Sequence, residues 1–167
     1  MNIEEADAPP HSLIAPFAQK EAHHTDCFVA ADVTADLPAL IEAFYTQPLF
    51  KAERVVLRLA AGARSSDAEA AALARGDAEK FAVWTVSART ETDILLADAS
   101  GRTMSWLSVA QGVAFGSVVV PVADRRGRLT LGPVFHSLMG AHKFYSRALL
   151  SGAISGLRRR GSLRHLT

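Results

Sequence analysis

The sequence predicts an α+β fold in which an antiparallel sheet wraps around a long C-terminal helix. Three observations support this fold class. Segments with strand-like alternation follow one another with short joins between residues 80 and 131, which is typical of an antiparallel meander. Apolar residues recur at steps of three or four from Phe135 to Leu157, which indicates one long helix. The first half combines helical stripes with one strand-like segment, so helices and strands both contribute to the core.

The composition favours one ordinary globular domain. Apolar residues make up 49% and charged residues 21% of the 167 positions, which is close to average usage in soluble domains. The formal net charge is +1, so the chain as a whole has no electrostatic attraction for nucleic acid. The longest apolar run, residues 118–123, is far shorter than the roughly 20 residues of a membrane span. We therefore expect a monomer or homodimer that binds neither nucleic acid nor membrane.

The ends of the chain are predicted to lie outside the domain. Residues 1–10 are acidic and proline-bearing and lack the pattern of a secretory signal, so we expect a disordered tail. Residues 11–160 form the single domain, and residues 161–167 form a short basic tail. The single cysteine, Cys27, permits no intramolecular disulfide, which fits a reducing compartment. We expect a cytoplasmic protein.

The first elements are predicted from caps and periodicity. Ser12 can cap a short helix, and residues 25–33 alternate as a strand. An apolar stripe between Asp36 and Pro48 predicts an amphipathic helix, with Asp36 as a possible cap. Residues 49–61 fit a helix or a strand, and we favour the helix.

The second half of the chain is predicted to contain most of the strands. Ser66 can cap a helix that ends at Gly76. The predicted strands that follow are residues 80–89, 92–97, 102–110, 113–122 and 129–131. The final helix begins after Gly132 and Pro133, runs for about 20–25 residues at this apolar spacing, and ends near Gly161.

Several short strings resemble the bacterial DUF2867 family, over about residues 20–155. They are AHHTDCF at 22–28, FYT at 44–46 with Phe50, Glu53 and Arg54, GRTMSWL at 101–107 and HKFYSRALL at 142–150. That family is similar in organisation to the START-like, or SRPBCC, helix-grip domains. The resemblance implies a sheet that grips the C-terminal helix, with a cavity between them. In similar folds this cavity holds apolar or aromatic ligands. Some relatives are enzymes such as cyclases, and others only bind or carry a ligand. The resemblance therefore implies a fold but not a particular reaction.

The candidate ligand-binding residues are mostly aromatic or basic: Trp84, Trp106, His142, Tyr145 and Arg147. If both tryptophans face the concave side of the sheet, with Tyr145 and His142 opposite, they form a pocket suited to an aromatic or apolar molecule. Two tryptophans that simply fill the core are the simpler interpretation. Arg147 can bind an acidic ligand or a structural carboxylate.

No catalytic or metal motif stands out. The histidines lack a third ligand at useful spacing, so no metal or other cofactor is predicted. Cys27 is interpreted as a buried, inert thiol, and no serine lies in a nucleophile elbow. Three hypotheses of function remain open: a domain that binds a small hydrophobic or aromatic molecule, which we favour; an enzyme of the same fold that uses general acid–base residues in the pocket; and an interaction or dimerisation module with a filled core.

Overall fold

The computed structural model of the chain describes residues 2–20, 22–52, 54, 62, 65–123, 127, 129–130 and 133–164, and within them the side chains other than those of 133–141 and 162–164. The helices are α1 (Ala15–Ala18), α2 (Leu37–Thr46), α4 (Asp67–Arg75) and α5 (Pro133–Arg164). The strands are β1 (Glu4–Glu5), β2 (His24–Ala30), β3 (Lys80–Phe81), β4 (Trp84–Arg89), β5 (Asp93–Asp98), β6 (Thr103–Ser108), β7 (Val113–Val119), β8 (Val122–Ala123) and β9 (Leu129–Thr130).

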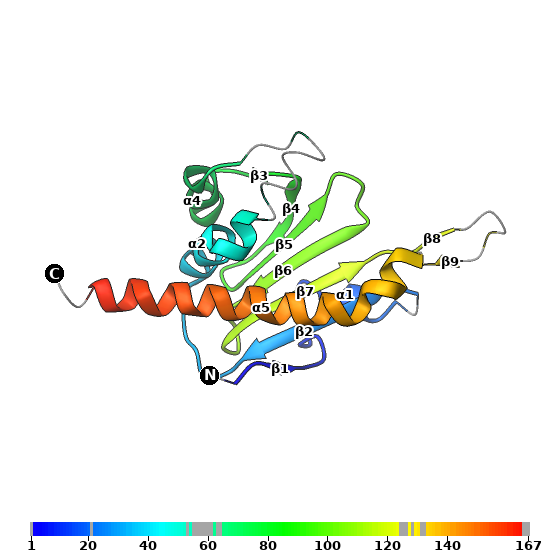
Figure 1. The fold of residues 1–167 in the computed structure, drawn as a ribbon, viewed down its shortest axis with the longest axis horizontal. Helices are drawn as coiled ribbons and strands as arrows, with labels where there is room; N and C mark the ends of the chain where they lie inside the picture. Colours follow the sequence, from blue (N-terminus) through cyan, green and yellow to red (C-terminus); the bar gives the residue numbers. More distant parts are fainter. Residues whose placement is uncertain are drawn as a thin grey trace.

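These elements form an α+β structure, as predicted. Within the described residues, seven strands make one antiparallel sheet in the order β1-β2-β7-β6-β5-β4-β3, and β8 pairs with β9 separately. The predicted meander is confirmed from β3 to β7. The early strand β2 pairs with the last strand of the meander, from His24 opposite Val119 to Ala30 opposite Val113. Figure 1 shows α5 lying across the sheet, with α2 and α4 to one side of it.

The sheet has a core on each face, because successive side chains of a strand point to opposite sides. The larger core faces the helices; its largest fully buried side chains are Phe28, Leu40, Ile41, Phe44, Tyr45, Leu73, Phe81, Ile94, Leu96 and Leu107. The smaller core lies on the other face and consists of Ile14, Cys27, Leu95, Trp106, Ala114 and Val118. Leu13 and Phe17, from the segment around α1, pack against this smaller core. Both faces of β2 are therefore covered, with Phe28 in the larger core and Cys27 in the smaller one.

Local capping explains where α2 and α4 begin and where α4 ends. The carboxylate of Asp36 accepts a hydrogen bond from the Ala39 N–H at 2.7 Å and starts α2. Ser66 and Glu69 form a capping box at the start of α4, which satisfies two otherwise unpaired donors. Gly76 ends α4 with φ of 84°, a conformation that glycine adopts without strain. The Arg89 guanidinium then donates to the last carbonyls of α4, at Leu73 and Ala74, and ties the helix to β4.

Three elements differ from their predicted extents. The strand expected over 80–89 is broken at Ala82, which has φ of 54°, so β3 and β4 form a tight antiparallel pair instead. The last helix has 32 residues, because Gly161 is tolerated inside it. Glu4 and Glu5, within the expected N-terminal tail, pair with β2. Of the ambiguous stretch 49–61, residues 49–52 and 54 are helical and the others lie outside the described residues.

Helix α5 packs closely on α2 at Gly152. The buried Gln47 side chain, at the end of α2, donates a hydrogen bond from Nε2 to the Leu149 carbonyl at 2.8 Å. A Cβ atom at Gly152 would overlap with Oε1 of Gln47. The two helices are therefore held together by a buried polar contact for which only glycine leaves room.

We expect Gly152→Ala to destabilise the protein by about 1–3 kcal/mol, because the added methyl group displaces Gln47 from its hydrogen bond. Urea denaturation followed by circular dichroism measures this. Gly161→Ala is the matched control, since a Cβ atom there meets nothing within 4 Å. The control should gain up to about 1 kcal/mol from helix propensity. Equal effects at the two positions would contradict the packing argument.

Candidate functional site

The structure does not bring all five candidate residues together. On β6, Leu107 faces the helices and Trp106 faces the opposite side, where its side chain is completely buried in the smaller core. Trp84 and Tyr145 pack against the larger core. The condition for the expected pocket, that both tryptophans face the C-terminal helix, is therefore not met. Trp84 retains a buried indole N–H without a hydrogen-bond partner among the described residues.

Arg147 and His142 lie on α5 but have different surroundings. Arg147 is exposed, and its guanidinium lies 5.5 Å from the centre of the Phe28 ring, which is a cation–π distance. His142 is half-buried and lies over β2 and β7, where its Nε2 is 2.9 Å from the Ser117 hydroxyl and 3.3 Å from a carboxylate oxygen of Asp26. His142 was predicted from the sequence as a candidate residue, whereas its partners Ser117 and Asp26 were not.

Asp26 is the centre of a buried polar cluster. Its side chain is 1% exposed. Oδ1 accepts from the N–H and from the hydroxyl of Ser117, at 2.9 and 2.6 Å. Oδ2 accepts from the Ser146 hydroxyl at 3.3 Å and lies the same distance from His142. One carboxylate therefore joins β2, β7 and α5.

The electrostatics of this cluster favour an ionised Asp26. Burial alone raises the pKa of Asp26, but hydrogen bonds from His142 and Ser117 and the charge of His142 outweigh it, so the pKa falls below the ordinary 3.8. Nearby, His24 lies with its ring centre 6.5 Å from that of His142. Burial lowers the pKa of His24 below 6.5, and the negative charge of Asp26 only partly opposes this. His24 is therefore mainly neutral at pH 7.

The cluster is arranged as a clamp rather than as a nucleophile with its base. In a catalytic triad the carboxylate and the nucleophile bind different ring nitrogens of the histidine. Here both Ser117 and Asp26 lie against Nε2 of His142, and the Ser117 hydroxyl is within 2.6 Å of the carboxylate, to which it donates. Ser117 is also buried. We conclude that the cluster fixes α5 on the sheet.

The stability provided by Asp26 is expected to disappear in acid. A carboxyl group whose pKa falls on folding stabilises the native state above its unfolded value, near 3.9, and loses that contribution as pH falls through the folded value. Asp26→Asn should therefore be less stable than the wild type at pH 7, and the difference should narrow as pH falls from neutral through the unfolded and then the folded pKa, where Asp26 becomes protonated. Urea denaturation at both ends of this range measures it. A difference that is constant with pH would contradict the depressed pKa.

Cys27 is confirmed as a buried thiol. It lies in the smaller core with 1% of its surface exposed. Burial, with added repulsion from Asp26 and Asp7, raises the pKa of Cys27 to about 12. The thiolate, which is the nucleophilic form, is therefore scarce at neutral pH.

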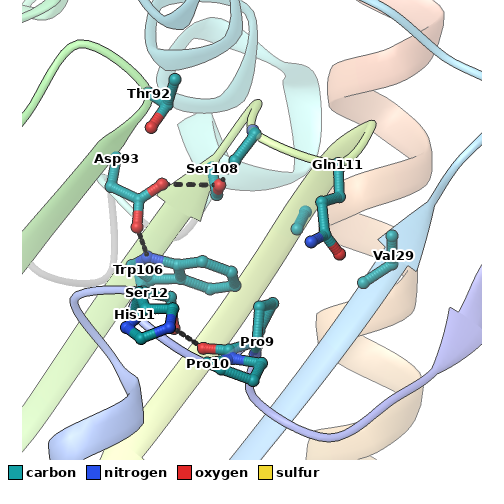
Figure 2. A pocket seen from close by; sticks show the side chains of 12 residues that line it. Pro9, Pro10, His11, Ser12, Val29, Thr92, Asp93, Trp106, Ser108 and Gln111 are labelled. Atoms are coloured by element: carbon teal, nitrogen blue, oxygen red, sulfur yellow. Dashed lines mark hydrogen bonds between the residues drawn. The ribbon is translucent and has the colours of Figure 1, made fainter.

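A pocket of about 250 Å³ opens beside Trp106, on the face of the sheet away from α5. Its walls come from the N-terminal segment, from β2 and from the ends of β5, β6 and β7; the lining residues are Pro9, Pro10, His11, Ser12, Val29, Thr92, Asp93, Trp106, Ser108, Ala110, Gln111 and Ala114. Figure 2 shows the indole of Trp106 between the prolines on one side and Asp93 and Ser108 on the other. The pocket is thus mainly apolar, with one polar end.

The polar end of the pocket is fixed by Asp93. Asp93 and Ser108 are cross-strand partners, so their side chains share a face with Trp106, two residues before Ser108. The carboxylate accepts from Trp106 Nε1 at 3.1 Å, from the Ser108 hydroxyl at 2.6 Å and from the Leu13 N–H at 3.1 Å. The last of these bonds anchors the N-terminal segment over the sheet. Asp93 therefore holds in place both Trp106 and Ser108 on the sheet and the N-terminal segment that covers them (Figure 2).

Trp106 was predicted from the sequence as a candidate residue, but Asp93 was not. The sequence did contain a signal for Asp93, because this acidic residue begins the otherwise apolar strand at 93–97. Acidic residues are seldom buried without partners, so its position indicated a polar contact. A second cavity, of about 490 Å³, lies along β2 and is mainly polar. Its lining residues include Glu5, Asp7, His23, His24 and Thr25. Among the residues that the structure describes, no group of three or more His, Cys, Asp or Glu side chains could hold a metal ion.

Comparisons with known proteins add no relative. No family model, no curated protein and no solved structure matches this chain. The resemblance to the DUF2867 family therefore stays a prediction. In the described part of the chain, no helix combines the length and apolar character that crossing a bilayer requires.

Proposed function

We propose that this chain binds a small aromatic or apolar molecule in the pocket beside Trp106. The observation that carries the proposal is a 250 Å³ cavity walled by Pro9, Pro10, Val29 and the Trp106 indole, with a buried polar pair at one end. Binding sites for small molecules have this composition, mostly apolar walls with a few placed polar groups. The volume suits a ligand with one or two rings, because pockets for drug-sized ligands measure about 300–1,000 Å³.

The ligand class is the one expected from the sequence, but the proposed site is on the other face of the sheet. Between the sheet and the helices, the described side chains of the larger core pack against one another; aromatic rings such as Phe44 and Phe115 lie with their centres 4.8 Å apart. The cavity beside Trp106, by contrast, is open, although Trp106 itself is completely buried at its edge. This difference supports the Trp106 pocket over a cavity beneath α5.

We also propose a helix-grip fold and a cytoplasmic location. The helix-grip proposal is supported by the pairing of β2 with β7 and by the placement of the long helix α5 against these two strands. The location is supported by the single buried cysteine, which needs no oxidising compartment.

A single-tryptophan variant tests the proposed function. Trp84→Phe leaves Trp106 as the only tryptophan, so its fluorescence reports the pocket. A library of small aromatic and aliphatic metabolites is screened by thermal shift, and hits are titrated by the fluorescence of this variant. A ligand at a hundredfold excess over its Kd should add about 2.7 kcal/mol to the free energy of unfolding and should change the emission of Trp106.

Occlusion of the pocket provides the matched control. Ala110 lines the pocket and is exposed, so Ala110→Phe should block the pocket at little cost in stability. Ala99→Phe adds the same ring to the exposed turn between β5 and β6. Loss of binding in the first variant only would support the site. Hits that bind Ala110→Phe as well as the wild type, or a library without hits, would refute the proposal.

A further inference from the structure

Asp93 places a buried negative charge at the end of the pocket. Only 5% of the residue is exposed, and burial of a carboxylate away from water is costly unless the charge is compensated. The three groups that bind it are an indole N–H, a backbone N–H and a serine hydroxyl, all of which are neutral. Among the described residues, no basic side chain forms an ion pair with Asp93. The charge is therefore stabilised by hydrogen bonds alone.

The hydrogen bonds leave one acceptor position on this carboxylate. A carboxylate offers about four lone-pair directions, two on each oxygen. Oδ2 receives the N–H groups of Leu13 and Trp106, so both of its positions are filled. From the part of the chain that the structure describes, Oδ1 receives only the Ser108 hydroxyl. Ser108 in turn accepts from the Ala110 N–H at 3.2 Å, so it is held in place and does not compete for the second position on Oδ1.

The other walls of the pocket suit a positively charged ligand. Trp106 borders the pocket beside the carboxylate and adds no positive charge there, because its indole N–H is bound to Asp93. Gln111 lines the pocket and carries a neutral acceptor oxygen. Among the described residues that line the pocket, His11 is the only other titratable one, and it is exposed. Figure 2 shows Asp93, Trp106 and Gln111 around the same space.

We infer that the ligand of this pocket is an organic cation, a protonated amine attached to an aromatic or apolar group. The inference rests on the proposed function and specifies its ligand class. The ammonium group would donate a hydrogen bond to the open position on Oδ1 of Asp93, and the apolar group would lie against Trp106 and the prolines. A neutral ligand of the same shape would leave the buried carboxylate without its counter-charge.

The test uses matched sets of small aromatic compounds that differ in one group. Phenethylamine, 2-phenylethanol and 3-phenylpropanoate form one set, and tryptamine, tryptophol and indole-3-propanoate form another. Affinities are measured by calorimetry on the wild-type chain. In at least one set we expect the amine to bind at least about tenfold more tightly than the alcohol, because charge-assisted hydrogen bonds are roughly twice as strong as neutral ones. The carboxylate should bind least.

Asp93→Asn supplies the sharper prediction. The asparagine side chain of this variant can still accept from Trp106 and Leu13 through its oxygen, while its amide group faces Ser108 and presents an N–H where the open acceptor was. The preference for the amine should be lost, and the alcohol should bind at least as well as the amine. Glu91→Gln is the control, because it removes one negative charge at an exposed position two residues away. This control should keep the wild-type preference.

The outcomes separate the two proposals. Alcohols that bind wild type as tightly as their amines would overturn the cation inference and leave the pocket itself supported. The cation inference is likewise overturned if Asp93→Asn folds, by circular dichroism, and retains the preference. If no amine in either set binds, the cation inference is overturned, and the metabolite screen with Ala110→Phe decides separately whether the pocket binds anything. Should Asp93→Asn fail to fold, the amine-to-alcohol ratio on the wild type remains decisive.

Discussion

Replacement of Asp26 by alanine is expected to cost about 3–5 kcal/mol, a large part of the roughly 5–15 kcal/mol that stabilises a typical domain. The carboxylate lies within hydrogen-bonding distance of donors from Ser117, Ser146 and His142, and its side chain is almost completely buried. Removal of one buried acceptor leaves these donors unsatisfied, at about 1–3 kcal/mol for each group that finds no other partner. The effect should be visible as a fall in the denaturation midpoint in urea.

Two further substitutions separate the clamp from simple packing. Ser146→Ala removes one of the two longest contacts of the cluster, at 3.3 Å, and should cost about 1 kcal/mol. Asp26→Ala in the background of Ser146→Ala should then cost less than it does alone, because one orphaned donor is gone. If both costs simply add, Ser146 does not belong to the cluster. If Asp26→Ala costs under about 1 kcal/mol, less than a single unsatisfied buried group, the clamp itself is refuted.

Phe44→Ala is expected to cost about 3–5 kcal/mol, the usual range for loss of a fully buried ring. Phe44 has no exposed surface and lies at the centre of an aromatic group, with ring centres 5.2 Å from Tyr45, 5.9 Å from Phe50 and 4.8 Å from Phe115. Its removal opens a cavity where α2 meets the sheet. Tyr45, Phe50 and Phe115 are themselves buried, so the neighbours can fill the space only in part.

Phe144→Ala is the matched control for this substitution. Phe144 carries the same ring on the outer face of α5, where it is 77% exposed. Its truncation should change the free energy of unfolding by no more than about 0.5 kcal/mol. Comparable costs at the two positions would mean that the outer face of α5 is covered in solution, for example by a second copy of the chain. Thermal and urea denaturation at several protein concentrations would distinguish that case.

The pH experiment and the ligand experiments concern opposite faces of one sheet. Asp26 points towards α5 and Asp93 towards the N-terminal segment. Variants of one cluster should therefore leave the other unaffected, because the two share no hydrogen-bond partner among the described residues. Asp26→Asn should bind pocket ligands as the wild type does, provided that the measurement is made well below its melting temperature.

Much of the fold could be predicted from the sequence, because it is determined locally. Alternation placed β5, β6 and β7 to within a few residues, and the caps at Asp36 and Ser66 placed the starts of α2 and α4. These signals depend on neighbours within one turn or one strand. The break at Ala82 was missed, because no glycine or proline marks it and the two-residue strand β3 is stabilised only by its pairing with β4.

The sites were decided by the tertiary structure. Strand periodicity shows that Trp106 and Ser108 share one face and Leu107 the other, but not which face the helices cover. Asp26 and His142 are far apart in the chain, and they meet only because β2 pairs with β7 beneath α5. Asp93 becomes the end of a pocket only because the N-terminal segment folds back over the sheet and donates the Leu13 N–H to it. Local residue patterns therefore determined the helices and strands. Long-range packing determined which face of the sheet the helices cover, which side chains meet, and which of them are enclosed in a pocket.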